Sequence, residues 1–181
     1  MLLKIYDKTH KLIGYVRKIR DLCIESSVED GNETLSFTYL AQYHSLDTEY
    51  YVETADGEYV IKELSESSDG FPEFVAVQNR EELWAKDYKS FSVKNSTIYD
   101  AARLACAGTG WTVHVPEVDD PEYIGKIRNA GMLDVNNADD VLQKLCAAFM
   151  LEIQYDSKNK QIFFYEKRGE DRGVYFKDGL N

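Results

Sequence analysis

The stretch Thr97 to Val115, TIYDAARLACAGTGWTVHV, predicts a short helix, a glycine stop and then a strand. Thr97 can cap the helix, and Asp100 follows three residues later as in a capping box. Apolar side chains then recur at helical spacing and form one face, at Ile98, Ala101, Ala102, Leu104 and Ala105. The alternation that begins at Trp111 indicates a half-buried strand.

The glycines at the end of this helix, Gly108 and Gly110, do not predict a phosphate-binding loop. Such a loop follows a strand and opens a helix, whereas these glycines follow a helix and precede a strand. Their expected role is to end the helix, because glycine adopts a left-handed C-terminal turn at the lowest cost.

A second unit of the same kind follows at residues 136–166. Asn136-Asn137-Ala138-Asp139-Asp140 is a capping cluster, and its two acids favour a helix N-terminus. Apolar residues at helical spacing then precede an alternating hairpin, with strands at 151–155 and 161–165. Residues of about 93 to 166 are therefore predicted to form a small α+β unit, in which two helices cover one face of a sheet.

The first ninety residues predict a run of antiparallel strands at short spacing, at 2–6, 11–16, 21–28, 34–40, 50–54, 58–64 and 73–78. Leu35, Phe37 and Tyr39 point to one face of their strand. A meander of this kind closes into a barrel or a sandwich to hide its edges. The predicted fold class is thus α+β: an antiparallel β-barrel-like domain followed by the small α+β domain.

The predicted domains are residues 1–92 and 93–168, with the start of a strand of a further domain at 169–181, where Val174-Tyr175-Phe176 has no partner strand. The segment from Tyr88 to Lys94 has neither glycine nor proline, which predicts a short, fairly rigid joint. Residues 81–86 fit a strand or a short helix, and residues 123–130 fit a strand or a helical turn.

The acidic composition argues against nucleic-acid binding. The chain has 181 residues, with 32 acids against 21 bases and a formal charge of −11. Phosphate contacts need a basic surface. Met1 to Tyr15 lacks the apolar core of a signal peptide, and no run of about 18 apolar residues predicts a membrane span.

No constellation for catalysis or metal binding is recognisable. The three cysteines (Cys23, Cys106 and Cys146) are predicted to be buried free thiols, and no Cys/His spacing fits zinc. His10 and His44 fall in predicted turns, and His114 lies on the strand side opposite Trp111. The acids at 117–122 are expected to form a solvated loop rather than a cation site. We therefore expect no catalytic, cofactor-binding or metal-ligating residues, and no enzymatic activity in these residues.

Several short motifs, taken in order, resemble the N-terminal region of phage minor tail structural proteins, the tail-associated lysin or prophage tail endopeptidase family. They are Glu33 to Tyr39 after an Asp30-Gly31 turn, Glu58 to Leu64, Gly108 to Val113, Phe163 to Gly169 and Gly173 to Asn181. Each motif is weak by itself, and the resemblance lies in their order and spacing over nearly the whole chain.

This resemblance implies a fold like that of the baseplate hub of contractile-tailed phages, and a structural role at the tail tip of the virion. It implies a homotrimer in the full-length protein, joined to the distal tail protein and the tape measure protein. A negative lumen would let DNA pass without trapping it. Any lytic activity of full-length members lies C-terminal to this region.

Two other functions remain open from the sequence: a cell-wall carbohydrate-binding module, and part of a peptidoglycan hydrolase. The 13 tyrosines and Trp111 could stack on sugars. Burial of Tyr39, Tyr59 and Trp111 would favour the structural function, whereas an exposed patch of these side chains would favour carbohydrate binding.

Overall fold

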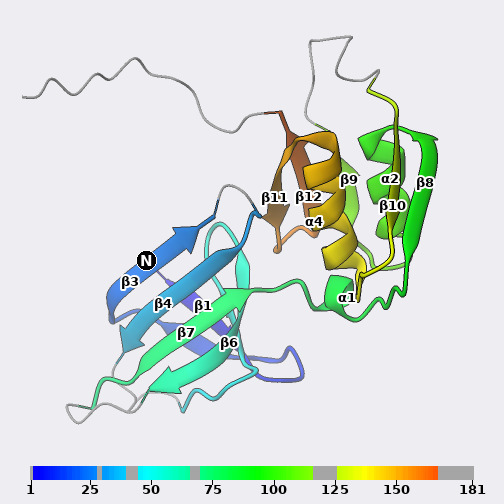
Figure 1. Ribbon diagram of the computed structural model, residues 1–181. Helices are drawn as coiled ribbons and strands as arrows, with labels where there is room; N and C mark the ends of the chain where they lie inside the picture. The colour runs from blue at the N-terminus through cyan, green and yellow to red at the C-terminus, as the bar shows by residue number, and fades with distance from the viewer. Residues whose placement is uncertain (1, 28–29, 40–44, 66–69, 116–125, 167–181) are drawn as a thin grey trace, which may run out of the picture.

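The computed structural model describes residues 2–27, 30–39, 45–65, 70–115 and 126–166. These residues form two lobes, which Figure 1 shows side by side. We call residues 3–78 the sheet lobe and residues 81–166 the helical lobe, and the chain passes between them at Asn79 and Arg80. None of the described helices is long and apolar enough to span a membrane.

The sheet lobe is one seven-stranded antiparallel sheet with the strand order β2-β1-β5-β6-β7-β4-β3. Its strands are β1 (Leu3–Tyr6), β2 (Leu12–Val16), β3 (Ile19–Ser26), β4 (Glu33–Tyr39), β5 (Tyr51–Glu53), β6 (Glu58–Ser65) and β7 (Glu73–Gln78). The predicted run of antiparallel strands is confirmed. Alternation along β4 buries Leu35, Phe37 and Tyr39, and Phe37 stacks on Phe74 of the neighbouring β7 with ring centroids 5.3 Å apart.

The sheet curls strongly but does not close as a hydrogen-bonded barrel. Its two edge strands, β2 and β3, are joined directly by Arg17 and Lys18, yet they form no ladder with each other among the described residues. Register shifts in the β1–β2, β3–β4 and β6–β7 pairs mark local irregularities, and bulges of this kind increase bending and twist. The predicted barrel-like domain is therefore a curled open sheet.

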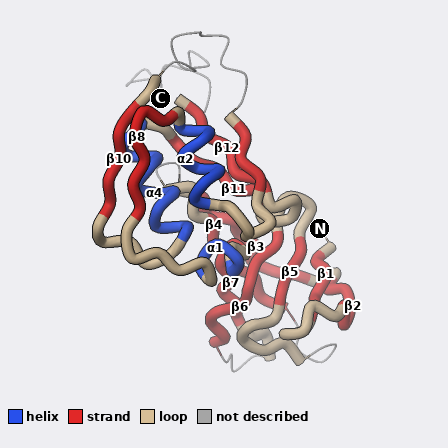
Figure 2. The backbone as a smooth tube through the Cα atoms, turned by 90° about the vertical axis from the view of Figure 1, so that its right-hand side faces the viewer, coloured by secondary structure: helices blue, strands red, loops and turns tan. Residues whose placement is uncertain are grey.

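The helical lobe has three layers, which are visible in Figures 1 and 2. One layer is the sheet β11-β12-β9, and another is the ribbon β10-β8. Helices α2 and α4 lie between them and contact both. The elements are α1 (Glu81–Trp84), β8 (Phe91–Ser96), α2 (Ile98–Ala105), β9 (Thr112–His114), β10 (Arg128–Met132), α4 (Ala138–Phe149), β11 (Glu152–Asp156) and β12 (Gln161–Tyr165).

Both predicted helix caps are confirmed. The Thr97 hydroxyl accepts a hydrogen bond from the backbone N–H of Asp100 at 3.2 Å, and the Asn137 side chain accepts one from the N–H of Asp140 at 2.9 Å. Gly108, at φ +85°, lies just after α2. The strands of the two predicted helix-and-strand units, residues 97–115 and 136–166, combine into one sheet, because β12 pairs antiparallel with β11 and parallel with β9.

The β10-β8 ribbon, which covers the second face of the helices, was not predicted from the sequence. Strand β8 takes in residues 91–94, which the sequence assigned to a rigid joint, and the ambiguous segment 123–130 contributes the start of its partner β10. Only Phe91 of β8 is buried, so buried and exposed side chains alternate only weakly along this strand. Residues 81–84 are helical rather than extended.

The hydrophobic residues divide into two clusters, one in each lobe. Leu83 and Phe91 pack in the cluster of the helical lobe, although both precede the domain boundary predicted at residue 93. That boundary stays a prediction. The predicted strand near Val174, the acidic loop at 117–122 and His44 lie outside the described residues.

Candidate functional site

The most elaborate polar arrangement in the described structure lies where the two lobes meet. We call it the lobe junction. It comprises side chains from β4 and its preceding turn, the β5–β6 and β11–β12 turns, the end of β7 and the start of α4: Asn32, Glu33, Glu53, Glu58, Gln78, Arg80, Asp139, Gln143, Tyr155, Ser157 and Lys158.

A buried ion pair forms the centre of the junction. Arg80 and Asp139 are only 6% and 9% exposed, and Nη1 of Arg80 lies 3.1 Å from Oδ1 of Asp139. The other guanidinium nitrogen, Nη2, donates to the side chain of Asn32 in the sheet lobe. The indole N–H of Trp84 donates to Oδ2 of Asp139 at 3.2 Å. Both charges are thus paired and hydrogen-bonded, as burial of charge requires.

Tyr155 of β11 completes this centre. Its hydroxyl donates to Asp139 at 2.8 Å and accepts from the amide of Gln143 at 3.1 Å, and its ring lies 4.4 Å below the guanidinium of Arg80. Burial, with the adjacent Asp139 carboxylate, raises the pKa of Tyr155 well above its ordinary value. Tyr155 therefore remains a neutral hydrogen-bond donor at any physiological pH.

Two amide side chains connect the lobes around this centre. Gln78, the last residue of β7, donates to the carbonyl of Tyr155 at 2.9 Å. Gln143 of α4 donates to the carbonyl of Asp30 at 2.7 Å. Each bond joins residues far apart in sequence, so the junction holds the β3–β4 turn and the end of β7 against the helical lobe.

Gly31 allows the lobes to approach each other closely. It has φ +64°, and a β-carbon at this position would lie 2.5 Å from the carbonyl oxygen of Ile153 on β11. Glycine alone meets both demands, because it lacks a β-carbon and tolerates a positive φ.

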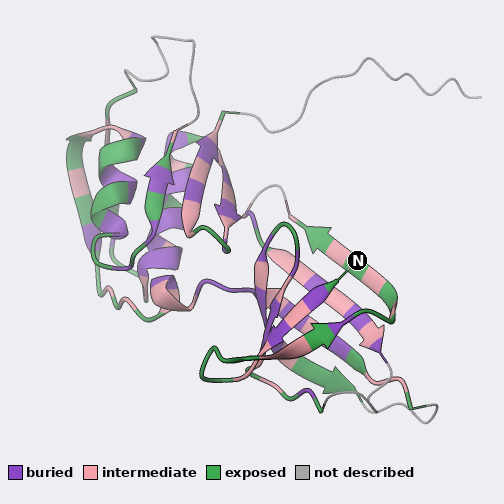
Figure 3. Ribbon diagram, turned by 180° about the vertical axis from the view of Figure 1, so that it is seen from behind, coloured by how far each residue is buried: buried purple, intermediate pink, exposed green. Residues whose placement is uncertain are grey.

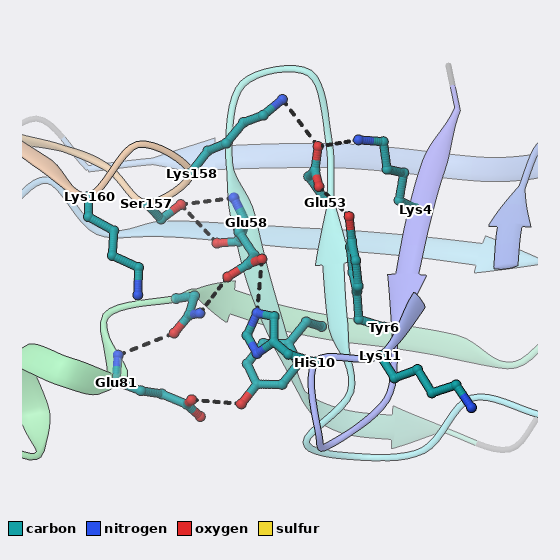
Figure 4. Close-up of polar contacts among 12 residues, drawn as sticks. Lys4, Tyr6, His10, Lys11, Glu53, Glu58, Glu81, Ser157, Lys158 and Lys160 are labelled. Carbon is teal, nitrogen blue, oxygen red and sulfur yellow. Dashed lines mark hydrogen bonds and ion pairs between the residues drawn. The ribbon is translucent and has the colours of Figure 1, made fainter. Parts of the chain in front are cut away.

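The outer part of the junction joins two turns, as Figure 4 shows. The Ser157 hydroxyl accepts from the backbone N–H of Glu58 and donates to its carbonyl, both at 2.9 Å. Next to it, the Lys158 ammonium lies 3.2 Å from the Glu53 carboxylate and donates to the carbonyl of Ala55 at 3.3 Å. The β11–β12 turn is thereby fixed to the β5–β6 turn.

Glu53 collects three donors at this point. Lys4 and Tyr6 of β1 each donate to it at 2.7 Å, and Lys158 approaches from the other lobe. Although burial opposes ionisation, these donors lower the pKa of Glu53 to about 2. The same hydrogen bond to Glu53 raises the pKa of Tyr6 to about 12.

His10 is an exposed turn residue, as predicted, and its side chain also contacts the neighbouring strands. Its Nε2 lies 3.2 Å from the Glu58 carboxylate, and its ring lies 3.8 Å from the ring of Tyr51, measured between centroids. The Tyr51 hydroxyl donates to Glu81 at 2.8 Å, and burial together with this carboxylate raises the pKa of Tyr51 to about 12. The turn is thus attached to the first residue of α1.

The cysteines differ in exposure. Cys106 and Cys146 are buried, as predicted, and burial raises the pKa of each thiol to about 12. Cys23 is exposed, so its predicted burial is wrong, because β3 is an edge strand with one face in solvent.

Over the described ranges, no cluster of three or more histidine, cysteine or acidic side chains could hold a metal ion.

The aromatic side chains that distinguish two of the predicted functions are buried. Tyr39 and Tyr59 are 1% exposed and Trp111 is 5% exposed. Tyr59 donates to Glu33 at 3.0 Å, and Trp111 donates to Glu82 at 3.2 Å. These three side chains stabilise the cores and do not form an exposed carbohydrate-binding patch.

Chemically, the lobe junction fixes one lobe against the other. Its partners lie too far apart in sequence for a local pattern to reveal it, because 59 residues separate Arg80 from Asp139 and 99 separate Glu58 from Ser157. The only local signal was the pair of adjacent acids at the start of α4, which we assigned to helix capping alone. Asp140 does accept the capping hydrogen bonds, whereas Asp139 turns inward.

Comparison with known proteins shows which proteins this chain is similar to. Residues 3–79, which is less than half of the chain, match the family model of the prophage endopeptidase tail N-terminal domain. The sheet lobe resembles that domain. The resemblance to prophage tail proteins that the sequence indicated is confirmed. A search of curated proteins gave no match.

Solved structures extend the likeness to both lobes. Prophage tail protein gp18 from Listeria monocytogenes EGD-e aligns with a TM-score of 0.68 at 16% identity, over 91% of this chain and 50% of that protein. The tail protein from Neisseria meningitidis MC58 aligns at 0.57 and 13% identity, over 90% and 49%. The 43 kDa tail protein of prophage MuSo2 from Shewanella oneidensis aligns at 0.55 and 14% identity, over 91% and 52%. The chain thus spans about half the length of these proteins and shares their fold.

Proposed function

We propose that this chain is a structural component of a phage or prophage tail tip, a baseplate-hub protein that connects the tail tube to the distal tip. The match of residues 3–79 to a prophage tail domain carries the proposal. The fold shared with three tail proteins supports it, since their similarity extends through the lobe junction into the helical lobe.

The junction suits such a role physically. A buried ion pair, a close approach at Gly31 and two hydrogen-bonded turns hold the lobes in one relative orientation. A component that sits between a tube and its tip has to keep its domains aligned in this way. The partners proposed are two further copies of the full-length protein, the distal tail protein and the tape measure protein.

The acidic charge of −11 supports a position around a DNA passage rather than a DNA-binding role. A negatively charged wall repels phosphates and leaves no site at which DNA would be retained. The proposed location is therefore the tail tip of the virion.

We assign no enzymatic step to these residues. Although the family description includes an endopeptidase, the buried Cys106 and Cys146 thiols are poor nucleophiles, because their raised pKa keeps them protonated. In a turnover assay on purified peptidoglycan, the chain should release no product. Reproducible cleavage that persists after repurification would contradict a purely structural assignment.

The experiment that tests the proposed location is immunogold electron microscopy of induced phage particles. Antibodies raised against the purified chain should label one end of the tail, opposite the capsid. Particles from a host in which the gene is deleted provide the control and should show no label. Label along the tail shaft, on the capsid, or only on material free of particles would refute the tail-tip assignment.

Light scattering over a range of concentrations tests the partners. A trimer of this chain would show that the ring-forming contacts lie within these residues. If the chain is monomeric and a chain extended beyond Asn181 is monomeric too, the homotrimer is refuted.

A further inference from the structure

The outer face of the β11-β12-β9 sheet carries side chains that neither core uses. Alternate residues of these strands pack inward on α2 and α4, among them Ile153, Ile162 and Val113. Their neighbours face outward. Phe163 lies at the centre of the outer face, with Gln154 opposite it on β11 and His114 opposite it on β9. Figure 3 shows this alternation of buried and partly exposed positions.

Three aromatic rings lie nearly parallel on this face. The ring centroids of His114 and Phe163 are 5.0 Å apart with an interplanar angle of 21°, and those of Phe163 and Tyr165 are 6.4 Å apart at 23°. Unlike Tyr39, Tyr59 and Trp111, these rings remain accessible. They form an aromatic strip whose neighbours on β11 are polar.

A groove runs from this strip to the lobe junction. It has a volume of about 490 Å³. Phe163, Tyr165 and Gln154 line one side, whereas Asp56 and Glu33 line the other side from the sheet lobe. Lys158 also lines the groove. Its ammonium group is paired with Glu53, as Figure 4 shows. The volume falls in the range of small-ligand sites, about 300–1,000 Å³.

Several polar groups in the groove have no partner within the part of the chain that the structure describes. The Gln154 amide, the Asp56 carboxylate and the Tyr165 hydroxyl make no hydrogen bond there. Together they offer donors and acceptors beside accessible rings. The acids of the groove repel anionic ligands, and its lysine is ion-paired with Glu53.

We propose that this groove binds a neutral oligosaccharide, with a sugar ring packed on Phe163 and Tyr165 and its hydroxyls hydrogen-bonded to Gln154 and Asp56. Sugars present an apolar C–H face and a rim of hydroxyls, so they match an aromatic strip bordered by amides and carboxylates. The groove binds saccharide whether or not the chain belongs to a tail tip.

The test is an NMR titration of the ¹⁵N-labelled full chain with maltose, cellobiose and N,N′-diacetylchitobiose, each raised to about 20 mM so that dissociation constants of the order of 10 mM are detected. We expect saturable shifts for at least one disaccharide, concentrated on the backbone amides of Gln154, Phe163 and Tyr165. Phe163→Ala should weaken this binding about tenfold, because it removes the stacking surface. Tyr99→Ala, which removes an exposed aromatic ring on α2, should leave the affinity unchanged.

Because Phe163 is partly buried, Gln154→Ala and Asp56→Asn provide variants that lose no apolar packing. Each should weaken binding about threefold to tenfold while the thermal unfolding midpoint stays within a few degrees of wild type. The absence of saturable shifts with all three disaccharides would overturn the proposal. So would equal binding by Phe163→Ala, Gln154→Ala and wild type, or stronger binding of inorganic phosphate in the same groove. Shifts of the same amides on raising the protein concentration alone would assign the face to contacts between copies.

Discussion

Replacing Asp139 by asparagine tests the central ion pair of the lobe junction. The substitution keeps the size of the side chain but removes its charge, which leaves the Arg80 guanidinium buried and without its counter-ion. Removing one partner of a buried pair costs about 3–5 kcal/mol. One oxygen still remains for Arg80 and Tyr155, so we place the expected loss near the lower end, at about 3 kcal/mol, which is roughly a hundredfold in the folding equilibrium constant.

The assay is urea unfolding of the full chain, followed by circular dichroism and by tryptophan fluorescence. Trp84 donates to Asp139, and Trp111 lies in the core of the helical lobe, so fluorescence reports directly on this lobe. Glu49→Gln is the matched control, because Glu49 forms an exposed ion pair with Lys62 at 2.8 Å. Loss of such a surface pair should cost less than about 1 kcal/mol.

A double-mutant cycle with Arg80→Met separates the pair from the rest of the junction. If the two charges depend on each other, the double variant is more stable than the sum of the single losses predicts, with a coupling of at least about 1 kcal/mol. Strictly additive losses, or a loss for Asp139→Asn no larger than that for Glu49→Gln, would refute the argument that the ion pair fixes the lobes.

Three further outcomes follow from the structure. Gly31→Ala should destabilise the chain by about 2 kcal/mol more than Gly70→Ala in the same urea assay. Both glycines have positive φ, but only Gly31 faces a neighbouring carbonyl oxygen. Equal losses would exclude a close approach of Gly31 to that oxygen. The folded-state pKa of Glu53, about 2, lies below its ordinary 4.5, so its contribution is present at neutral pH and lost as the pH falls from about 4.5 towards 2. Glu53→Gln should therefore lower stability at pH 7 by about 1–2 kcal/mol, discounted for the partly exposed lysines, and by much less at pH 2.5; a pH-independent difference would contradict this account. Cys23 should react with a thiol reagent in the native chain, whereas the two buried cysteines should react only after unfolding, as a spectrophotometric thiol titration would show; fast labelling of all three would contradict the described burial.

Local signals in the sequence predicted much of the fold correctly. The caps at Thr97 and Asn137, the glycines after α2 and the alternation along β4 each act within a few residues, so a short window contains all their information. These signals led to the two helices, the terminal hairpin and the run of antiparallel strands.

The missed features depend on contacts between distant segments. Strand β8 has little alternation of its own and is stabilised by β10, which lies more than thirty residues later. The burial of a strand also depends on its place in the sheet, and no window of sequence shows that β3 is an edge, so the exposure of Cys23 was mispredicted.

The candidate sites were less predictable than the fold for the same reason. Arg80 and Asp139 are ordinary surface residue types, and only the meeting of two lobes makes them a buried pair. The sequence did raise carbohydrate binding, but on Tyr39, Tyr59 and Trp111. The accessible rings are instead those of Phe163 and Tyr165, because the inward and outward sides of β12 are set by the helices that cover the sheet.

The spacing of the junction contacts along the chain also sets an order for folding. The sheet lobe is contiguous, from Leu3 to Gln78, and all its strand pairs can form once these residues have been synthesised. Its links to Gln143 and Ser157 bridge 113 and 99 residues, so they close very long loops and must wait for α4 and the β11–β12 hairpin. On the ribosome, the lobe that matches the prophage tail domain is therefore able to fold first and to serve as a template on which the later lobe docks.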